Sequence, residues 1–110
     1  MAQDRDVKET VLTVSEVNRL AKQALERISV RVQGEVSGLR TGYPYYVYFN
    51  LRDSDATLPA IITRKFFDAL DFRLEEGSAV VVSGRLSIFE KQGKFQIRVE
   101  DIRPFGEGDI

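Results

Sequence analysis

The sequence predicts a mainly β fold, a small five-stranded barrel with one helix before it and a short helix between its third and fourth strands. The first observation is that apolar and polar residues alternate in five segments of strand length. These segments are residues 30–37, 45–52, 57–63, 80–89 and 95–100. The second is Gly34, in the middle of the first segment, where glycine indicates a bulge or a sharp coil. The third is a helical stretch without turn-forming residues after the third segment.

The composition is that of one folded domain. The chain has 110 residues, of which 43% are hydrophobic and 30% charged, enough for a single modest core. It has no cysteine, which excludes disulfides, and no histidine, the commonest general base and metal ligand. No apolar run approaches the ~20 residues of a membrane span, and no secretory signal opens the sequence. We therefore expect a cytoplasmic protein that makes no membrane contact.

The first predicted element is an amphipathic helix. It follows a polar, aperiodic segment at residues 1–11, which predicts a mobile tail. Thr13 and Glu16 have the spacing of a capping box, with Thr13 as N-cap. Apolar residues then recur at helical spacing to about residue 27, at Val14, Val17, Leu20, Ala21, Ala24, Leu25 and Ile28. We expect this stripe to pack on one end of the sheet.

Each strand has one apolar row, which we assign to the barrel interior. The rows are Val30, Val32 and Val36; Tyr45, Val47, Phe49 and Leu51; Leu58, Ala60 and Ile62; Val80, Val82, Gly84, Leu86 and Ile88; and Phe95, Ile97 and Val99. Pro59 cannot donate to a ladder, so the third strand should be an edge or unpaired there. Ile102 breaks the alternation and predicts a bulge near Asp101.

The connections complete the order of elements. Residues 65–72 predict the short helix, and Asp53-Ser54-Asp55 predicts a turn rather than a metal site. Loops are expected at residues 38–44 and 90–94, the second with Gly93 in the permissive position of a hairpin. Three strands, a helix and a hairpin form the order of the OB-fold, a Greek-key barrel that commonly binds oligonucleotides. A small β-sandwich has a similar pattern, but the short helix favours the barrel.

The rows that face away from the core indicate a function. Tyr46 and Tyr48 share such a row, where they either cover the sheet or stack on nucleobases. The net charge is −1, yet cations dominate residues 30–52 and 77–99 while acids collect elsewhere. The candidate nucleic-acid-binding residues are Tyr46, Tyr48, Arg52, Arg31, Arg40, Arg85, Phe89, Lys91, Lys94 and Arg98. We expect no catalytic and no metal-binding residue, because the sequence offers no carboxylate cluster and no glycine-rich phosphate loop.

Five segments together resemble one family. They are Thr13-Val14-Ser15-Glu16-Val17-Asn18, Val32-Gln33-Gly34-Glu35-Val36-Ser37, Tyr48-Phe49-Asn50-Leu51-Arg52-Asp53, Phe89-Glu90-Lys91-Gln92-Gly93-Lys94-Phe95-Gln96 and Pro104-Phe105-Gly106-Glu107-Gly108. In this order and with matching gaps, the chain from about residue 12 onward resembles the N-terminal domain of the exodeoxyribonuclease VII large subunit. Members often have His at Tyr46, a polar or basic residue at Pro59 and an aromatic at Thr63. We therefore expect less DNA contact from the third strand.

The resemblance implies an OB-fold that binds single-stranded DNA and presents it to a separate nuclease domain for exonucleolytic degradation to oligonucleotides. Together with the residue patterns, it divides the chain into a tail at 1–11, a helix and OB-fold domain at 12–103, and the start of a linker at 104–110. From its residues we expect no enzymatic activity and no cofactor for this fragment, and metal use by the nuclease domain stays open. The expected partners are single-stranded DNA, the rest of the large subunit and, through it, small subunits. A barrel used for protein–protein docking and an RNA-binding OB module remain alternatives.

Overall fold

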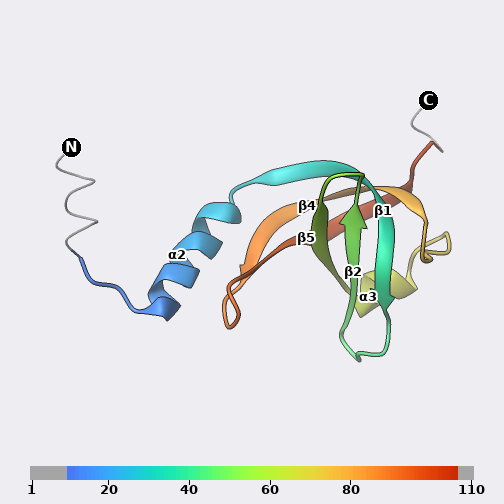
Figure 1. Cartoon of the computed structure of the whole chain (residues 1–110). Coiled ribbons are helices and arrows are strands. Elements are labelled where there is room, and N and C mark those ends of the chain that lie inside the picture. Colours follow the sequence, from blue (N-terminus) through green and yellow to red (C-terminus); the bar gives the residue numbers. More distant parts are fainter. Residues whose placement is uncertain (1–9, 107–110) are drawn as a thin grey trace.

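The computed structural model describes residues 10–106 and shows a closed five-stranded barrel (Figure 1). Its elements are α2 Val14–Leu25, β1 Ser29–Arg40, β2 Tyr46–Arg52, β3 Thr57–Thr63, α3 Arg64–Asp68, β4 Ala79–Phe89 and β5 Lys94–Pro104. The strands follow one another around the barrel as β1-β2-β3-β5-β4, and only β3 and β5 are parallel. The predicted class and element order are confirmed. Residues 1–9 of the predicted tail and 107–110 of the predicted linker lie outside the described residues.

The core is one cluster of apolar side chains to which every strand contributes. Its buried members are Val36, Val47, Phe49, Leu51, Ala60, Ile62, Leu74, Val80, Val82, Ile97 and Ile102. The interior rows therefore follow the predicted alternation in the middle of the strands. The prediction fails at the ends: Tyr45 precedes β2 and is 77% exposed, and Phe95 is 43% exposed. Phe95 lies in the β4–β5 hairpin, which extends beyond the barrel toward α2 (Figure 1).

Bulges bend two of the strands. In β1 the register shifts between Ser37 and Arg40, around Gly38 with its positive φ of 61°. At Gly34 the prediction was a bulge or a sharp coil: the bulge is not there, because Gly34 stays in register, and it lies where β1 passes from β4 to β2. In β5 the register shifts at Glu100, one residue from the predicted position. The ladder from β3 to β5 begins at Ala60, directly after Pro59, as the missing proline N–H requires.

A glycine makes the close β4–β5 contact possible. Gly84 lies at the register shift and is buried in the sheet. A Cβ at this position would collide with the backbone carbonyl oxygen of Arg98. Because that oxygen belongs to the neighbouring strand, a side chain at Gly84 fits only if the ladder opens.

Helix α2 begins as its capping box predicts. Thr13 Oγ1 accepts the Glu16 backbone N–H at 3.1 Å, and the Glu16 carboxylate accepts the Thr13 N–H at 2.8 Å. The backbone bond from Thr13 holds the pKa of Glu16 below its ordinary value. The helix ends at Leu25. No helix among residues 10–106 has the length and apolar character to span a membrane.

The apolar stripe of α2 is packed only in part: Ala21 and Leu25 are half-buried, whereas Val14, Val17, Leu20 and Ala24 are exposed. Val17 is 50% and Leu20 54% exposed, and no residue of the helix is fully buried. The helix instead meets the β4–β5 hairpin through Asn18, Lys22 and Glu26, which are spaced four residues apart and so share one side. Polar partners on the hairpin, rather than apolar burial, therefore set the rotation of the helix.

Helix α3 is shorter than residues 65–72. The Thr63 hydroxyl caps it by accepting the Phe66 N–H at 3.2 Å, and the helix ends at Asp68. Its Phe66 and Phe67 pack against the core. The predicted turn after β2 is confirmed: the Asp53 carboxylate accepts the backbone N–H groups of Asp55 and Ala56 at 2.8 and 2.9 Å. These bonds hold the pKa of Asp53 below its ordinary value.

Candidate nucleic-acid interface

One face of the barrel is hollowed into a groove of about 1020 Å³. The outer faces of β2 and β3 form one wall, the β4–β5 hairpin forms the other, and α2 reaches in at the side. Six cationic side chains and three carboxylates are among the described residues that line it: Lys22, Arg40, Arg85, Lys91, Lys94 and Arg98, with Glu26, Glu90 and Glu100. The groove is therefore positively charged although the chain as a whole is not.

Strand register joins side chains from all five strands into one row across this face. Arg40 lies opposite Tyr48, and Tyr48 lies opposite Ile61. Ile61 is the parallel neighbour of Arg98, which lies opposite Arg85. Cations thus stand at both ends of the row with an aromatic and an aliphatic surface between them. An extended chain of alternating bases and phosphates offers apolar rings and anionic groups in a similar arrangement.

Three tyrosines gather on the β1–β2 side of the groove. The rings of Tyr43 and Tyr48 meet edge to face with centroids 5.1 Å apart at 82°. Tyr46 is tilted 49° against Tyr48 at 6.4 Å and is 41% exposed. The Arg40 guanidinium lies 5.5 Å from the Tyr48 ring centroid, a cation–π distance. Tyr48 is held by these neighbours, whereas part of the Tyr46 side chain stays open to solvent.

The β1 bulge and the following loop are tied down from two sides. The Glu76 carboxylate accepts the backbone N–H groups of Leu39 and Gly38 at 3.0 and 2.9 Å. These bonds hold the pKa of Glu76 below its ordinary value. The Arg64 guanidinium donates to the carbonyl oxygen of Thr41. The segment that carries Arg40 and Tyr43 is thereby fixed on both sides of Arg40.

The hairpin wall concentrates positive charge. Arg85 and Arg98 lie directly opposite each other across β4 and β5, and like charges in such a pair destabilise a sheet. Each has one carboxylate within reach: Arg85 Nε lies 3.4 Å from Glu100 Oε2, and Arg98 Nη1 lies 3.8 Å from Glu26 Oε2. These two carboxylates offset part of the repulsion between the arginines.

The structure gathers most of the predicted binding residues, with two exceptions. Those that line the groove are Tyr46, Tyr48, Arg40, Arg85, Phe89, Lys91, Lys94 and Arg98. Phe89 is 43% exposed near the hairpin turn. Arg31 and Arg52 are not among the lining residues. The Arg52 guanidinium instead binds the Glu35 carboxylate across β1 and β2, with Nη2 at 2.7 Å and Nε at 3.1 Å from Oε1.

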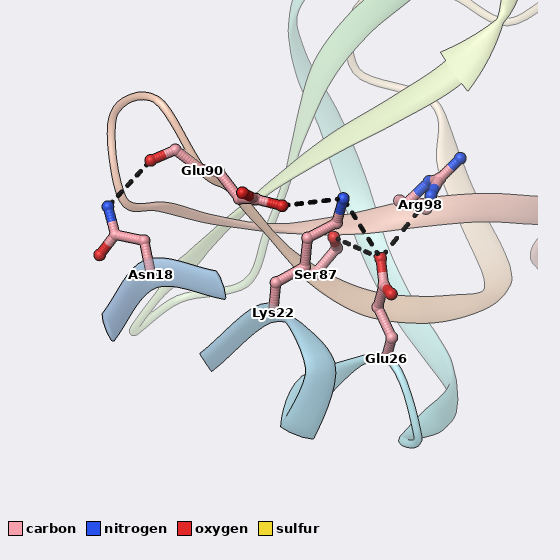
Figure 2. A network of polar contacts seen from close by, with 6 residues as sticks. All are labelled: Asn18, Lys22, Glu26, Ser87, Glu90 and Arg98. Carbon is pink, nitrogen blue, oxygen red and sulfur yellow. Dashed lines mark hydrogen bonds and ion pairs between the residues drawn. The ribbon is translucent and has the colours of Figure 1, made fainter. Parts of the chain in front are cut away.

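Sequence reasoning did not select several side chains that line the groove: Tyr43, Ile61, Ser87, Lys22 and Glu26. A sequence feature could have identified Tyr43, because it is an aromatic residue in a loop between glycine and proline. A weaker feature marks Lys22 and Glu26, namely the repeat of polar residues every four positions along the helix. Figure 2 shows this side of α2 turned toward the hairpin, where Asn18 and Lys22 contact Glu90 and Glu26 lies between Ser87 and Arg98.

The chain is similar in sequence to large subunits of exodeoxyribonuclease 7 from several bacteria. The exodeoxyribonuclease 7 large subunit of Clostridium botulinum (strain Okra / Type B1) is 35% identical over 103 residues, 90% of this chain and 26% of that protein. The subunit of the same name from Geotalea uraniireducens (strain Rf4) is 36% identical over 102 residues, 91% of this chain and 23% of that protein. The chain thus spans about a quarter of the length of these relatives.

A solved structure and a family model agree on the fold. Asparaginyl-tRNA synthetase of Entamoeba histolytica, in complex with asparaginyl-adenylate, superposes with a TM-score of 0.61 over 74% of this chain and 21% of that one. At 17% identity this likeness concerns the fold alone. Residues 12–103 match the family model described as an OB-fold nucleic acid binding domain. The chain therefore belongs to the family of OB-fold nucleic acid binding domains and is homologous to part of the exodeoxyribonuclease 7 large subunit.

Proposed function

We propose that this domain binds single-stranded DNA in the groove and presents it to a separate nuclease domain of an exodeoxyribonuclease large subunit in the cytoplasm. The observation that carries the proposal is the placement of Tyr46 and Tyr48 on the same concave surface as five of the predicted arginines and lysines. Stacking requires an exposed base face, which single strands have and duplexes bury. The phosphates of such a strand find cations on both walls of the groove.

Each group has a distinct role in this proposal. Tyr46 and Tyr48 stack on bases, with Arg40 adding its charge beside the second ring. Arg85 and Arg98 bind phosphates along the hairpin wall. Lys91 and Lys94, exposed at the hairpin turn, add further phosphate contacts. None of these contacts reads a base edge, so the binding is expected to be independent of sequence.

Hydrolysis belongs to another part of the subunit in this proposal. The relatives' name is that of a nuclease, and this chain spans only about a quarter of their length. Within residues 10–106, no group of three or more His, Cys, Asp or Glu side chains has the arrangement of a metal site. We therefore assign binding to this chain, cutting to the rest of the large subunit, and association with small subunits to the whole.

One observation favours a second function, protein docking. The apolar side of α2 is open to solvent, with Val14 79% and Leu20 54% exposed. A helix side of this kind is typical of contacts with another protein surface. The two functions use different faces of α2 and lead to different results with nucleic acid.

Titration of fluorescently labelled oligomers tests the proposed function. We expect weak binding that prefers single-stranded DNA over duplex and weakens steeply with salt. With about four to six cations on phosphates, the logarithm of the affinity should fall by about 3 to 4 for each tenfold rise in salt. Fluorescence anisotropy with single-stranded DNA, duplex DNA and RNA of equal length measures both the preference for single strands and the dependence of the affinity on salt. Equal affinity for single strands and duplex, or no dependence on salt, would favour docking, and a preference for RNA would favour an RNA-binding module.

A further inference from the structure

Three donors on the hairpin side of the groove converge on one oxygen atom of the chain itself. Glu26 Oε2 lies 3.4 Å from Ser87 Oγ, 3.8 Å from Arg98 Nη1 and 3.9 Å from Lys22 Nζ (Figure 2). Ser87 and Arg98 come from β4 and β5, Lys22 comes from α2, and Glu26 is the C-cap residue of that helix. A carboxylate from outside the barrel thus lies where two cations and a hydroxyl meet.

The carboxylate fits this position loosely. Charge-assisted hydrogen bonds between nitrogen donors and an anionic oxygen are normally about 2.7–2.9 Å long, shorter than either cation contact here. Within residues 10–106, the contacts of Glu26 engage one of its two carboxylate oxygens, Oε2. A phosphodiester is tetrahedral and presents two anionic oxygens in different directions, so it reaches donors on both sides of the site better than a planar carboxylate does.

Because of the Ser87 hydroxyl, release of Glu26 from this position requires another hydrogen-bond acceptor to replace it. Ser87 is 1% exposed, and its hydroxyl is satisfied by Glu26. Leaving a buried hydroxyl without a partner costs free energy. In residues 10–106 no buried side-chain nitrogen or oxygen is left in that state. Glu26 therefore leaves readily only when another acceptor takes its place.

We propose that Lys22, Ser87 and Arg98 form a phosphate subsite of the groove, and that Glu26 occupies it until a phosphate of a single-stranded nucleic acid displaces it. This inference rests on the proposed function and adds to it a named subsite and an internal competitor. The competitor lowers the affinity of the free domain and selects against weak anions. Two other contacts keep the helix on the hairpin during the exchange: Asn18 Nδ2 donates to the Glu90 carbonyl at 2.9 Å, and Lys22 Nζ lies 3.4 Å from Glu90 Oε1.

The test compares Glu26→Gln with Glu75→Gln by anisotropy titration of a labelled oligothymidylate. Glu75 is a matched control, because its carboxylate also pairs with an arginine, Arg73 at 3.5 Å, but is not among the groove residues. Glu26→Gln is expected to bind about two- to fivefold more tightly than wild type at low salt. The slope of the logarithm of its affinity against the logarithm of the salt concentration should be steeper by about 0.7. The reason is that on binding phosphate, Arg98 then releases a counterion instead of the Glu26 carboxylate. Glu75→Gln should bind as wild type does.

Repeating the substitution in a second variant distinguishes an effect at this site from the general effect of removing one negative charge. In a chain that carries Arg98→Gln, the gain from Glu26→Gln is expected to shrink, since the two side chains act through the same contact. An equal gain in both backgrounds, or equal gains from Glu26→Gln and Glu75→Gln, would overturn the subsite while leaving the proposed function intact. If none of the proteins binds the oligomer while all keep the wild-type melting transition, the proposed function fails and the subsite fails with it.

Discussion

Replacing Phe49 with alanine is expected to lower the free energy of unfolding by about 3–5 kcal/mol. Phe49 lies in the middle of β2, faces Ala60 of β3 and is 1% exposed, so its removal leaves a cavity in the centre of the barrel. A domain of this size has only about 5–15 kcal/mol of stability in total. Chemical denaturation monitored by circular dichroism measures the loss, and we expect the variant to unfold at a clearly lower denaturant concentration than wild type.

The neighbouring residue provides the control. Tyr48 lies on the outer face of the same strand, and its ring contacts are with Tyr43, Tyr46 and Arg40. Tyr48→Ala is expected to cost about 1 kcal/mol of stability, because it removes partly exposed ring contacts rather than core packing. If Tyr48→Ala unfolds the domain and Phe49→Ala does not, the assignment of faces along β2 is inverted.

The second large effect is expected at Gly84. Gly84→Ala should lower the free energy of unfolding by about 3 kcal/mol, the upper part of the range for overpacking, because the new methyl group meets a backbone oxygen that cannot rotate away. The β4–β5 ladder must open to accept it, and the Arg85–Arg98 pair beside it moves as well.

Gly42→Ala is the matched control for Gly84→Ala. Gly42 lies in the loop before β2, has no atom within 4 Å of an added Cβ and does not have a positive φ. This substitution is expected to leave the melting temperature unchanged or to raise it slightly. Equal melting temperatures for the two alanine variants would show that the β4–β5 contact at Gly84 is looser than described.

The barrel interior was predictable because alternation along a strand fixes which side chains face the core. Phe49, Val82 and Ile97 follow this rule and are buried. Tyr45 did not, since alternation does not show where a strand begins. The rotation of α2 was not predictable either: helical periodicity locates an apolar stripe, but Lys22 and Glu26 find their partners more than 60 residues away in sequence.

The candidate site was predictable to the extent that it depends on strand faces. Tyr46, Tyr48 and Arg98 project from the same side of the barrel because outward rows of paired strands share a face. Whether a charge on such a row lines the groove depends on register, which the sequence does not state. Arg52 illustrates this, since pairing of β1 with β2 places it directly opposite Glu35. Tyr43 joins the site through loop geometry rather than alternation.

The central claim is that the groove binds single strands by stacking bases on its tyrosines, and two adjacent tyrosines test it most directly. Tyr46 lines the groove, whereas Tyr45 is 77% exposed and lies outside it. Anisotropy titration of a labelled single-stranded oligomer compares Tyr46→Ala and Tyr45→Ala with wild type at low salt. We expect Tyr46→Ala to lose about 1–3 kcal/mol of binding free energy, roughly a 5- to 150-fold rise in Kd, and Tyr45→Ala to bind as wild type. Equal affinity of the two variants would contradict the claim.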